Sequence, residues 1–209
     1  MLVASTVAFA QPQDNDYYAA RQTSYGVHLL GVVEGHHLEQ GLTKMRAGNY
    51  YFAHGDFEFI LRYFPNHPRA LAHMSELCDL RWKDARCDVE EWFRKAVAIN
   101  ARAPQTFLAY GVHLQRSNRP QDAIEAYKRA IELDPLQGNA HYNLGLIYLE
   151  KKQYDAANRH AQLAYALAMP FPALRDKLMQ AGQWRPMEAA ELKRELSPTG
   201  KTPDAAPPK

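Results

Sequence analysis

The sequence predicts an all-α fold of helical hairpins that stack into a solenoid. Its clearest sign is a period of 34 residues, in which Gly111 recurs as Gly145 and Ala123 recurs as Ala157. A fixed period of this length is typical of repeat proteins in which each repeat is one supersecondary unit. Apolar residues within the period recur at spacings of three and four, and no segment sustains a period-two alternation. We therefore expect helices throughout and essentially no sheet.

Two further repeats precede the clear pair. Gly41 and Ser75 occupy the place of Gly111 and Gly145, so the successive spacings are 34, 36 and 34 residues. Each unit should hold two antiparallel helices, and the small residue lets the second helix approach the first. The spacings divide the repeat region, residues 34–171, into four units: 34–67, 68–103, 104–137 and 138–171.

The third unit has the fullest motif: Phe107, Tyr110, Gly111, Leu114, Ala123, Tyr127, Ala130 and Pro135. This pattern resembles the tetratricopeptide repeat (TPR) family, and the resemblance covers residues 34–171. It implies a right-handed superhelical solenoid of about four TPR hairpins. It also implies that the first helices of the hairpins line a concave groove, which holds a protein or peptide partner.

The family's helical phase assigns residues to this groove. They are Leu38, Leu42, Met45, Glu76, Asp79, Leu108, Val112, Gln115, Tyr142, Asn143, Leu146 and Leu149. Asn143 matches an Asn that often bonds the backbone of a bound peptide in this family. The Lys, Asn and Arg set of the family's carboxylate clamp is absent. The apolar set with an acidic middle, Glu76 and Asp79, favours an amphipathic helix or an extended apolar peptide. Self-association through the same face is an alternative.

The segment before the repeats has two parts. Residues 1–10 resemble the end of a secretory signal peptide, because an apolar run leads to the small-residue pattern Ala8-Phe9-Ala10. The positively charged start of such a signal is absent, so either the true start lies upstream of Met1 or these residues are instead a disordered apolar start. Residues 11–33 form an N-terminal extension, in which we expect 11–25 to be loose. The apolar residues 26–33 should pack as an extra helical segment, and whether they fill the groove stays open.

The segment after the repeats should close the solenoid. Within residues 172–196 we expect a capping helix, with Leu174, Leu178 and Ala181 on one face, and then a short helix. Trp184 should pack against this cap. Residues 197–209 are rich in proline and should form a disordered tail.

The only two cysteines, Cys78 and Cys87, flank the turn of the second unit, which is two residues longer than the corresponding turns. If the chain is exported to an oxidising compartment, we expect them to form a disulfide. Two free thiols are the alternative in a cytosolic protein. The spacing of nine residues lacks the close pairs of zinc sites and of C-x-x-C redox sites.

Composition and motifs disfavour several classes of function. The net charge of +2 and the scattered basic residues argue against nucleic-acid binding. No apolar run approaches the length of a transmembrane segment. None of the common nucleotide-binding, hydrolase or metalloprotease motifs is present, so we expect no enzyme and no cofactor.

The sequence therefore favours a non-enzymatic protein-protein interaction scaffold or adaptor in the bacterial periplasm, or a secreted one. The runner-up is a protein that binds a metal, haem or a small ligand through histidines and tyrosines. Its candidate histidines are His37, His73 and His141, on the first helices of three units. Packed or solvated histidines are the better explanation, so we assign no metal site.

Overall fold

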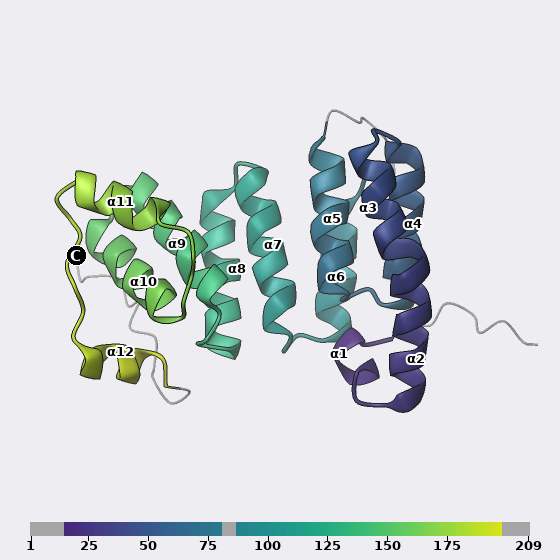
Figure 1. Cartoon of the computed structure of the whole chain (residues 1–209), viewed down its shortest axis with the longest axis horizontal. Helices are drawn as coiled ribbons and strands as arrows, with labels where there is room; N and C mark the ends of the chain where they lie inside the picture. The colour runs from purple at the N-terminus through teal and green to yellow at the C-terminus, as the bar shows by residue number, and fades with distance from the viewer. Residues whose placement is uncertain (1–14, 81–86, 198–209) are drawn as a thin grey trace, which may run out of the picture. The chain divides into compact units, whose positions relative to one another are not determined.

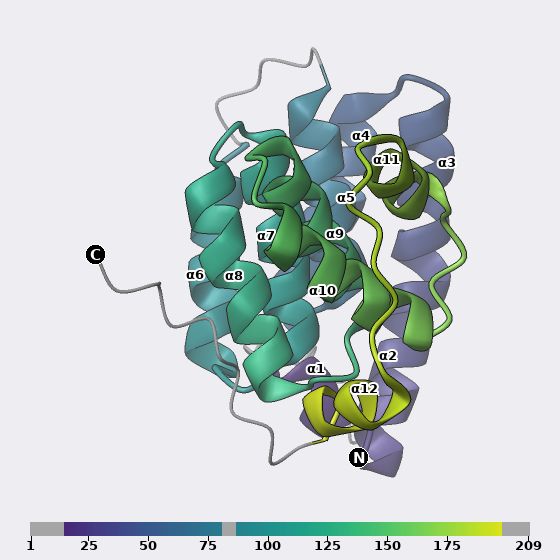
Figure 2. The same cartoon turned by 90° about the vertical axis from the view of Figure 1, so that its left-hand side faces the viewer.

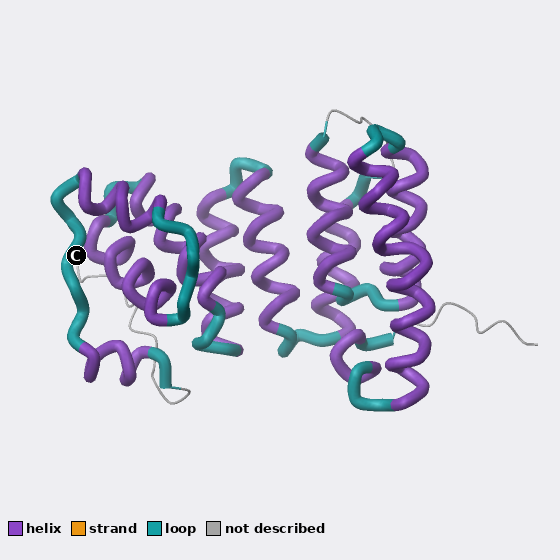
Figure 3. Tube along the Cα trace, in the orientation of Figure 1, coloured by secondary structure: helices purple, strands orange, loops and turns teal. Residues whose placement is uncertain are grey.

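The computed structural model describes residues 15–80 and 87–197 of the chain. The predicted signal peptide, residues 1–10, lies outside the described residues, as does the predicted tail apart from Ser197. Helices and loops make up all of the described residues (Figure 3), which confirms the all-α fold class. The chain separates into two compact units, Met1–Ala101 (unit 1) and Arg102–Lys209 (unit 2).

The described part of unit 1 contains one long continuous helical segment and four shorter helices. Its elements are α1 (Tyr17–Ala20), α2 (Ser24–Val33), η1 (Glu34–Leu38), α3 (Glu39–Arg46), α4 (Tyr50–Tyr63), α5 (Pro68–Asp79) and α6 (Val89–Ile99). The elements α2, η1 and α3 follow one another without a break, and η1 and α3 run beside α4 (Figure 1). The middle element, η1, is a π-helical segment, which holds more residues per turn than the α-helix on either side.

The N-terminal extension is more ordered than the sequence indicates. Asp16 caps α1 by accepting a hydrogen bond from the backbone of Tyr18. The same carboxylate accepts hydrogen bonds from Asn66 Nδ2 at 2.7 Å and Asn100 Nδ2 at 2.9 Å. Residues 15–25 are therefore not loose, because partners far along the chain hold them. Residues 26–33 are helical as expected, and Val33 is buried in unit 1.

Unit 2 consists of two hairpins and a closing segment. Its helices are α7 (Pro104–Arg116), α8 (Pro120–Leu133), α9 (Gly138–Glu150), α10 (Tyr154–Ala166), α11 (Ala173–Gln180) and α12 (Ala189–Glu195). Pro104 and Pro120 stand in the first turns of α7 and α8, where a missing N–H costs no helical hydrogen bond. Helices α11 and α12 lie near opposite ends of α10 (Figure 2).

The repeated glycines allow the two helices of a hairpin to meet. A Cβ atom placed on Gly111 would lie 2.5 Å from Cε1 of Tyr127, which is fully buried on α8. A Cβ on Gly41 would similarly lie 2.7 Å from Cε1 of Phe57 on α4. Since carbon atoms cannot approach so closely, only glycine permits these aromatic rings to fill the space between the helices.

Helix α11 covers the end of the second hairpin in unit 2, as the sequence predicts for a cap. Leu174 and Leu178 are fully buried against the core of that unit. Met179, one period after Gly145, instead exposes 57% of its surface. Among the described helices of unit 2, none therefore packs on Met179 in the way that α8 packs on Gly111.

Candidate functional site

The predicted groove residues of unit 1 differ in accessibility. Leu38 and Leu42 are buried, with 1% and 8% of their surfaces exposed, so they pack within the unit. Leu38 ends the π-helical segment, where a face assigned from α-helical phase no longer applies. Met45 is half-buried.

The two acidic groove residues both lie on α5 of unit 1. Glu76 is half-buried, and its Oε2 lies 3.4 Å from Nδ1 of His73. Asp79 is exposed and is the last residue of the helix. The acidic character predicted for this part of the groove is thus accessible on unit 1.

Unit 2 carries an apolar strip on its two first helices. Leu108 and Val112 of α7 and Leu146 and Leu149 of α9 are half-buried and pack against one hydrophobic core. We call these four residues the α7–α9 strip. Each has a surface that remains accessible on a rigid helix. Tyr142 is 8% exposed and contacts the ring of Phe171 at a centroid distance of 5.8 Å, so it contributes mainly to the packing beneath.

The two polar groove residues of unit 2 share a partner in the core. The hydroxyl of Tyr127 donates a hydrogen bond to Gln115 Oε1 at 3.0 Å, and the side chain of Asn143 also bonds this phenol. Burial raises the pKa of Tyr127 well above its ordinary value, while the bond with Asn143 lowers it by less. Asn143 therefore joins α9 to α8 in the free chain, in addition to any contact with a ligand.

The candidate histidines have partners within the fold. His37 Nδ1 donates to Asp56 Oδ1 at 2.9 Å, and His73 contacts Glu76. His141 donates from Nε2 to the carbonyl of Pro135 at 3.2 Å, so its Nδ1 accepts from Nδ1 of His160 at 2.9 Å. Within the described residues, no group of three or more His, Cys, Asp or Glu side chains is placed to hold a metal ion.

The two cysteines are close enough to be bonded. Cys78 lies in the last turn of α5 and Cys87 two residues before α6, with Cα atoms 5.6 Å and sulfur atoms 2.11 Å apart. The two sulfur atoms therefore lie at bonding distance, as the predicted disulfide requires. Among the described helices, none is long and apolar enough to cross a membrane.

The sequence did not indicate the contact surface on α10. The α10 residues Asp155, Asn158 and Gln162 bind the segment around Arg185, as described below. In the sequence these residues are ordinary polar positions of an amphipathic helix. Only the Trp184-Arg185 pair in the connection between α11 and α12 could have indicated this contact.

Comparison with known proteins agrees with this architecture. Residues 108–170 match the family model described as tetratricopeptide repeat. Among solved structures, PilF of Pseudomonas aeruginosa aligns with a TM-score of 0.57 and 21% identity, over 78% of this chain and 75% of its own. PilW, a type IV pilus biogenesis factor, aligns at 0.55 and 24%, over 69% and 68%. The MamA protein aligns at 0.53 and 20%, over 79% and 91%. These likenesses establish the fold alone.

Curated proteins match over shorter stretches. Protein O-mannosyl-transferase TMTC3 of Mus musculus is 29% identical over 97 residues, which are 46% of this chain and 10% of that protein. The peroxisomal targeting signal receptor of Eremothecium gossypii is 38% identical over 77 residues, 37% of this chain and 13% of the receptor. The chain thus spans little more than a tenth of these relatives. The family match and the fold together identify the helical hairpins of residues 108–170 as tetratricopeptide repeats.

Proposed function

We propose that this chain is a non-enzymatic adaptor that binds a peptide or an amphipathic helix of a partner protein on the α7–α9 strip. The observation that carries the proposal is the strip itself, four apolar side chains presented by two helices of one repeat pair. Such a surface matches recognition in which a helix or extended peptide lays its apolar residues against a preformed groove.

The relatives support an adaptor role by analogy. One solved neighbour is a pilus biogenesis factor, and one curated relative is a receptor for a targeting signal. The first name refers to the biogenesis of a pilus, and the second to the reception of a signal. We carry over only an adaptor role to this chain, without a specific partner.

We further propose that the adaptor works in the periplasm or outside the cell. The apolar start with Ala8-Phe9-Ala10 and the adjacent Cys78 and Cys87 sulfur atoms support this location. Mass spectrometry of the native protein tests it. We expect a mature chain that begins at Gln11, and a protein that retains Met1 would contradict export by cleavage.

Site-specific crosslinking tests the binding surface. A photoreactive amino acid replaces Leu146 in the strip or, as a control, Glu125 on the exposed face of α8. We expect a partner that crosslinks from position 146 and not from 125. Equal capture at both positions would contradict the proposal.

Affinity measurements with the captured partner then test the apolar contact. Leu108→Glu and Leu146→Glu should each weaken binding by about 10-fold or more, because a buried leucine side chain contributes about 1.5–3 kcal/mol. The matched control is Leu136→Glu, the same substitution at a leucine that is 57% exposed outside the strip. Circular dichroism should remain helical for all three variants. Unchanged binding by both strip variants would refute the assignment.

A further inference from the structure

Helix α10 holds a short non-helical segment of the same chain by its backbone. The side-chain amide of Asn158 pairs with both main-chain polar atoms of Arg185. Its Oδ1 accepts from the backbone N–H at 2.9 Å, and its Nδ2 donates to the carbonyl at 2.8 Å. Gln162 Nε2 donates to the same carbonyl at 2.9 Å. Because these bonds involve only main-chain atoms of the segment, they can hold an extended peptide with any residue except proline at the position of Arg185.

The neighbouring side chains add a preference for sequence. Trp184 is half-buried and meets the ring of Tyr165 edge-on, with centroids 5.9 Å apart. The guanidinium of Arg185 donates to Asp155 Oδ1 at 3.1 Å. The face of α10 therefore presents an aromatic contact beside a carboxylate, spaced for an aromatic residue that is followed by arginine.

The segment is held in a way that permits exchange. Gly182 precedes it with a φ of +66°, in the left-handed region where glycine is favoured, and forms the C-terminal cap of α11. The ion pair between Arg185 and Asp155 is largely exposed, and exposed ion pairs contribute little to stability. Helix α12, which follows, buries none of its residues, although Glu195 pairs with Arg159 of α10. If the segment left α10, it would lose three hydrogen bonds to its main chain, one exposed ion pair and the packing of Trp184 against the core of unit 2. None of residues 183–185 is fully buried, so these contacts lie at the surface of the unit.

We propose that Asp155, Asn158, Gln162 and Tyr165 form a second peptide-binding site, which accepts an extended aromatic-arginine segment of another protein. Residues 183–185 occupy this site in cis as an internal competitor. A covalently attached ligand acts at a high effective concentration, so the partner segment binds only weakly until the internal segment is displaced. The site is formed by α10 and does not depend on the α7–α9 strip.

Peptide binding to the full chain tests this arrangement. The probe is a fluorescein-labelled peptide of residues 182–187, Gly-Gln-Trp-Arg-Pro-Met, and its control carries Ala-Ala in place of Trp-Arg. The double variant Trp184→Ala/Arg185→Ala weakens the internal ligand and leaves α10 intact. In fluorescence anisotropy, it should bind the probe about tenfold more tightly than the unaltered chain and discriminate against the control peptide.

A substitution in α10 tests the backbone contact. Asn158→Ala, added to the double variant, should reverse the gain in affinity, whereas Asn139→Ala at an exposed asparagine of α9 should not. Arg185→Asp provides a second loosened chain that keeps Trp184 in its packed position and places two carboxylates together. If neither loosened chain binds the probe more tightly than the unaltered chain, or if Asn158→Ala has no effect on binding, the proposal is overturned.

Discussion

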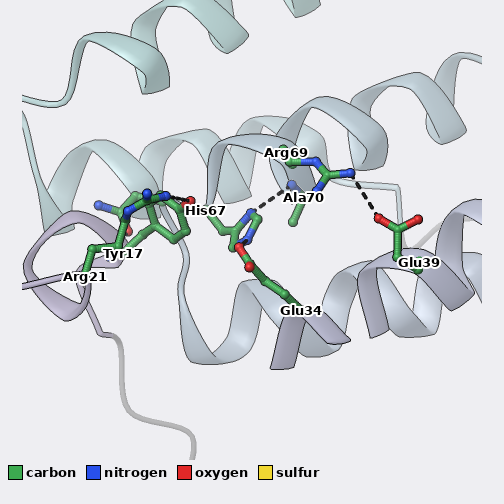
Figure 4. Close-up of polar contacts among 8 residues, drawn as sticks. Tyr17, Arg21, Glu34, Glu39, His67, Arg69 and Ala70 are labelled. Carbon is green, nitrogen blue, oxygen red and sulfur yellow. Dashed lines mark hydrogen bonds and ion pairs between the residues drawn. The ribbon is translucent and has the colours of Figure 1, made fainter. Parts of the chain in front are cut away.

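His67 donates from its Nε2–H to Glu34 Oε1 across 2.8 Å and thereby ties the start of α5 to the π-helical segment η1 (Figure 4). The other ring nitrogen, Nδ1, accepts the backbone N–H of Ala70 and caps α5. The ring is fully buried and lies edge-on to Tyr17, with centroids 4.6 Å apart. The bond to Glu34 requires a proton on Nε2, and the bond from Ala70 requires an unprotonated Nδ1. Together they require a neutral imidazole.

Acidification should destabilise the fold through His67. Burial lowers the pKa of His67 below its ordinary value of 6.5, while the contact with Glu34 offsets part of this effect. As the pH falls below 6.5, the unfolded chain takes up a proton that the folded chain resists. The contribution to the free energy of unfolding is therefore complete above pH 6.5 and is lost as the pH falls through the folded-state pKa.

The measurement is urea unfolding of the full chain between pH 4.5 and 7.5. His67→Asn retains an N-capping side chain but cannot titrate, so it should make the free energy of unfolding less steep in pH. An equally steep dependence in this variant would show that other groups cause the acid sensitivity.

The buried Asn66 should be essential for holding the N-terminal extension. Its Oδ1 accepts the backbone N–H of Tyr17 at 2.8 Å, and its Nδ2 donates to Asp16. Asn66→Ala should lower the free energy of unfolding by about 2 kcal/mol, since it leaves buried polar groups without partners. Amide hydrogen exchange in α1 should accelerate. A loss of stability without faster exchange in α1 would contradict this link.

Two glycine substitutions should act in opposite directions. Gly111→Ala places a methyl group against Tyr127, whose ring is fixed by Gln115 and Asn143, and should destabilise the fold by about 1–3 kcal/mol. Gly31→Ala on α2 meets no atom within 4 Å and should stabilise it by about 0.5–1 kcal/mol. Denaturant midpoints measure both. If the two substitutions changed stability similarly, helix propensity and not the contact with the Tyr127 ring would determine the effect of Gly111→Ala.

The cysteine pair should be oxidised in the native protein. Thiol labelling under denaturing, non-reducing conditions should find no free cysteine. Replacing both Cys78 and Cys87 by alanine should reduce the free energy of unfolding by about 2–3 kcal/mol, as expected for closing a loop of about ten residues. Two labelled thiols per chain would instead favour the cytosolic alternative.

Sequence periodicity was sufficient to predict the hairpins because it reflects local contacts. Gly111 and Tyr127 lie on the two helices of one hairpin, which a short turn connects. Their spacing in the sequence recurs wherever a glycine and an aromatic ring make the same contact. The cap was predictable for the same reason, since Leu174 and Leu178 continue the apolar pattern of α9.

Contacts that do not repeat leave no such pattern. Asp16 reaches Asn100 across 84 positions, and Asn158 reaches Arg185 across 27, with no periodic sign of either contact. The predicted groove has the same limitation. The position of a residue around its helix could not show that Leu38 is buried or that Asn143 bonds Tyr127. The burial and the bond both depend on how neighbouring helices pack.

The side chain of Met179 limits the number of helical hairpins in unit 2, because it fills the space in which a further helix would pack. A second helix can pack on α7 because glycine leaves room at position 111, whereas a thioether occupies the equivalent position of α11. Protein engineers could therefore lengthen the array by two changes. Met179→Gly would leave space on α11 for the close approach of a second helix. A grafted copy of residues 154–166 would provide that helix. The same substitution without the graft would only remove an exposed apolar side chain, because no second helix would be present to fill the space.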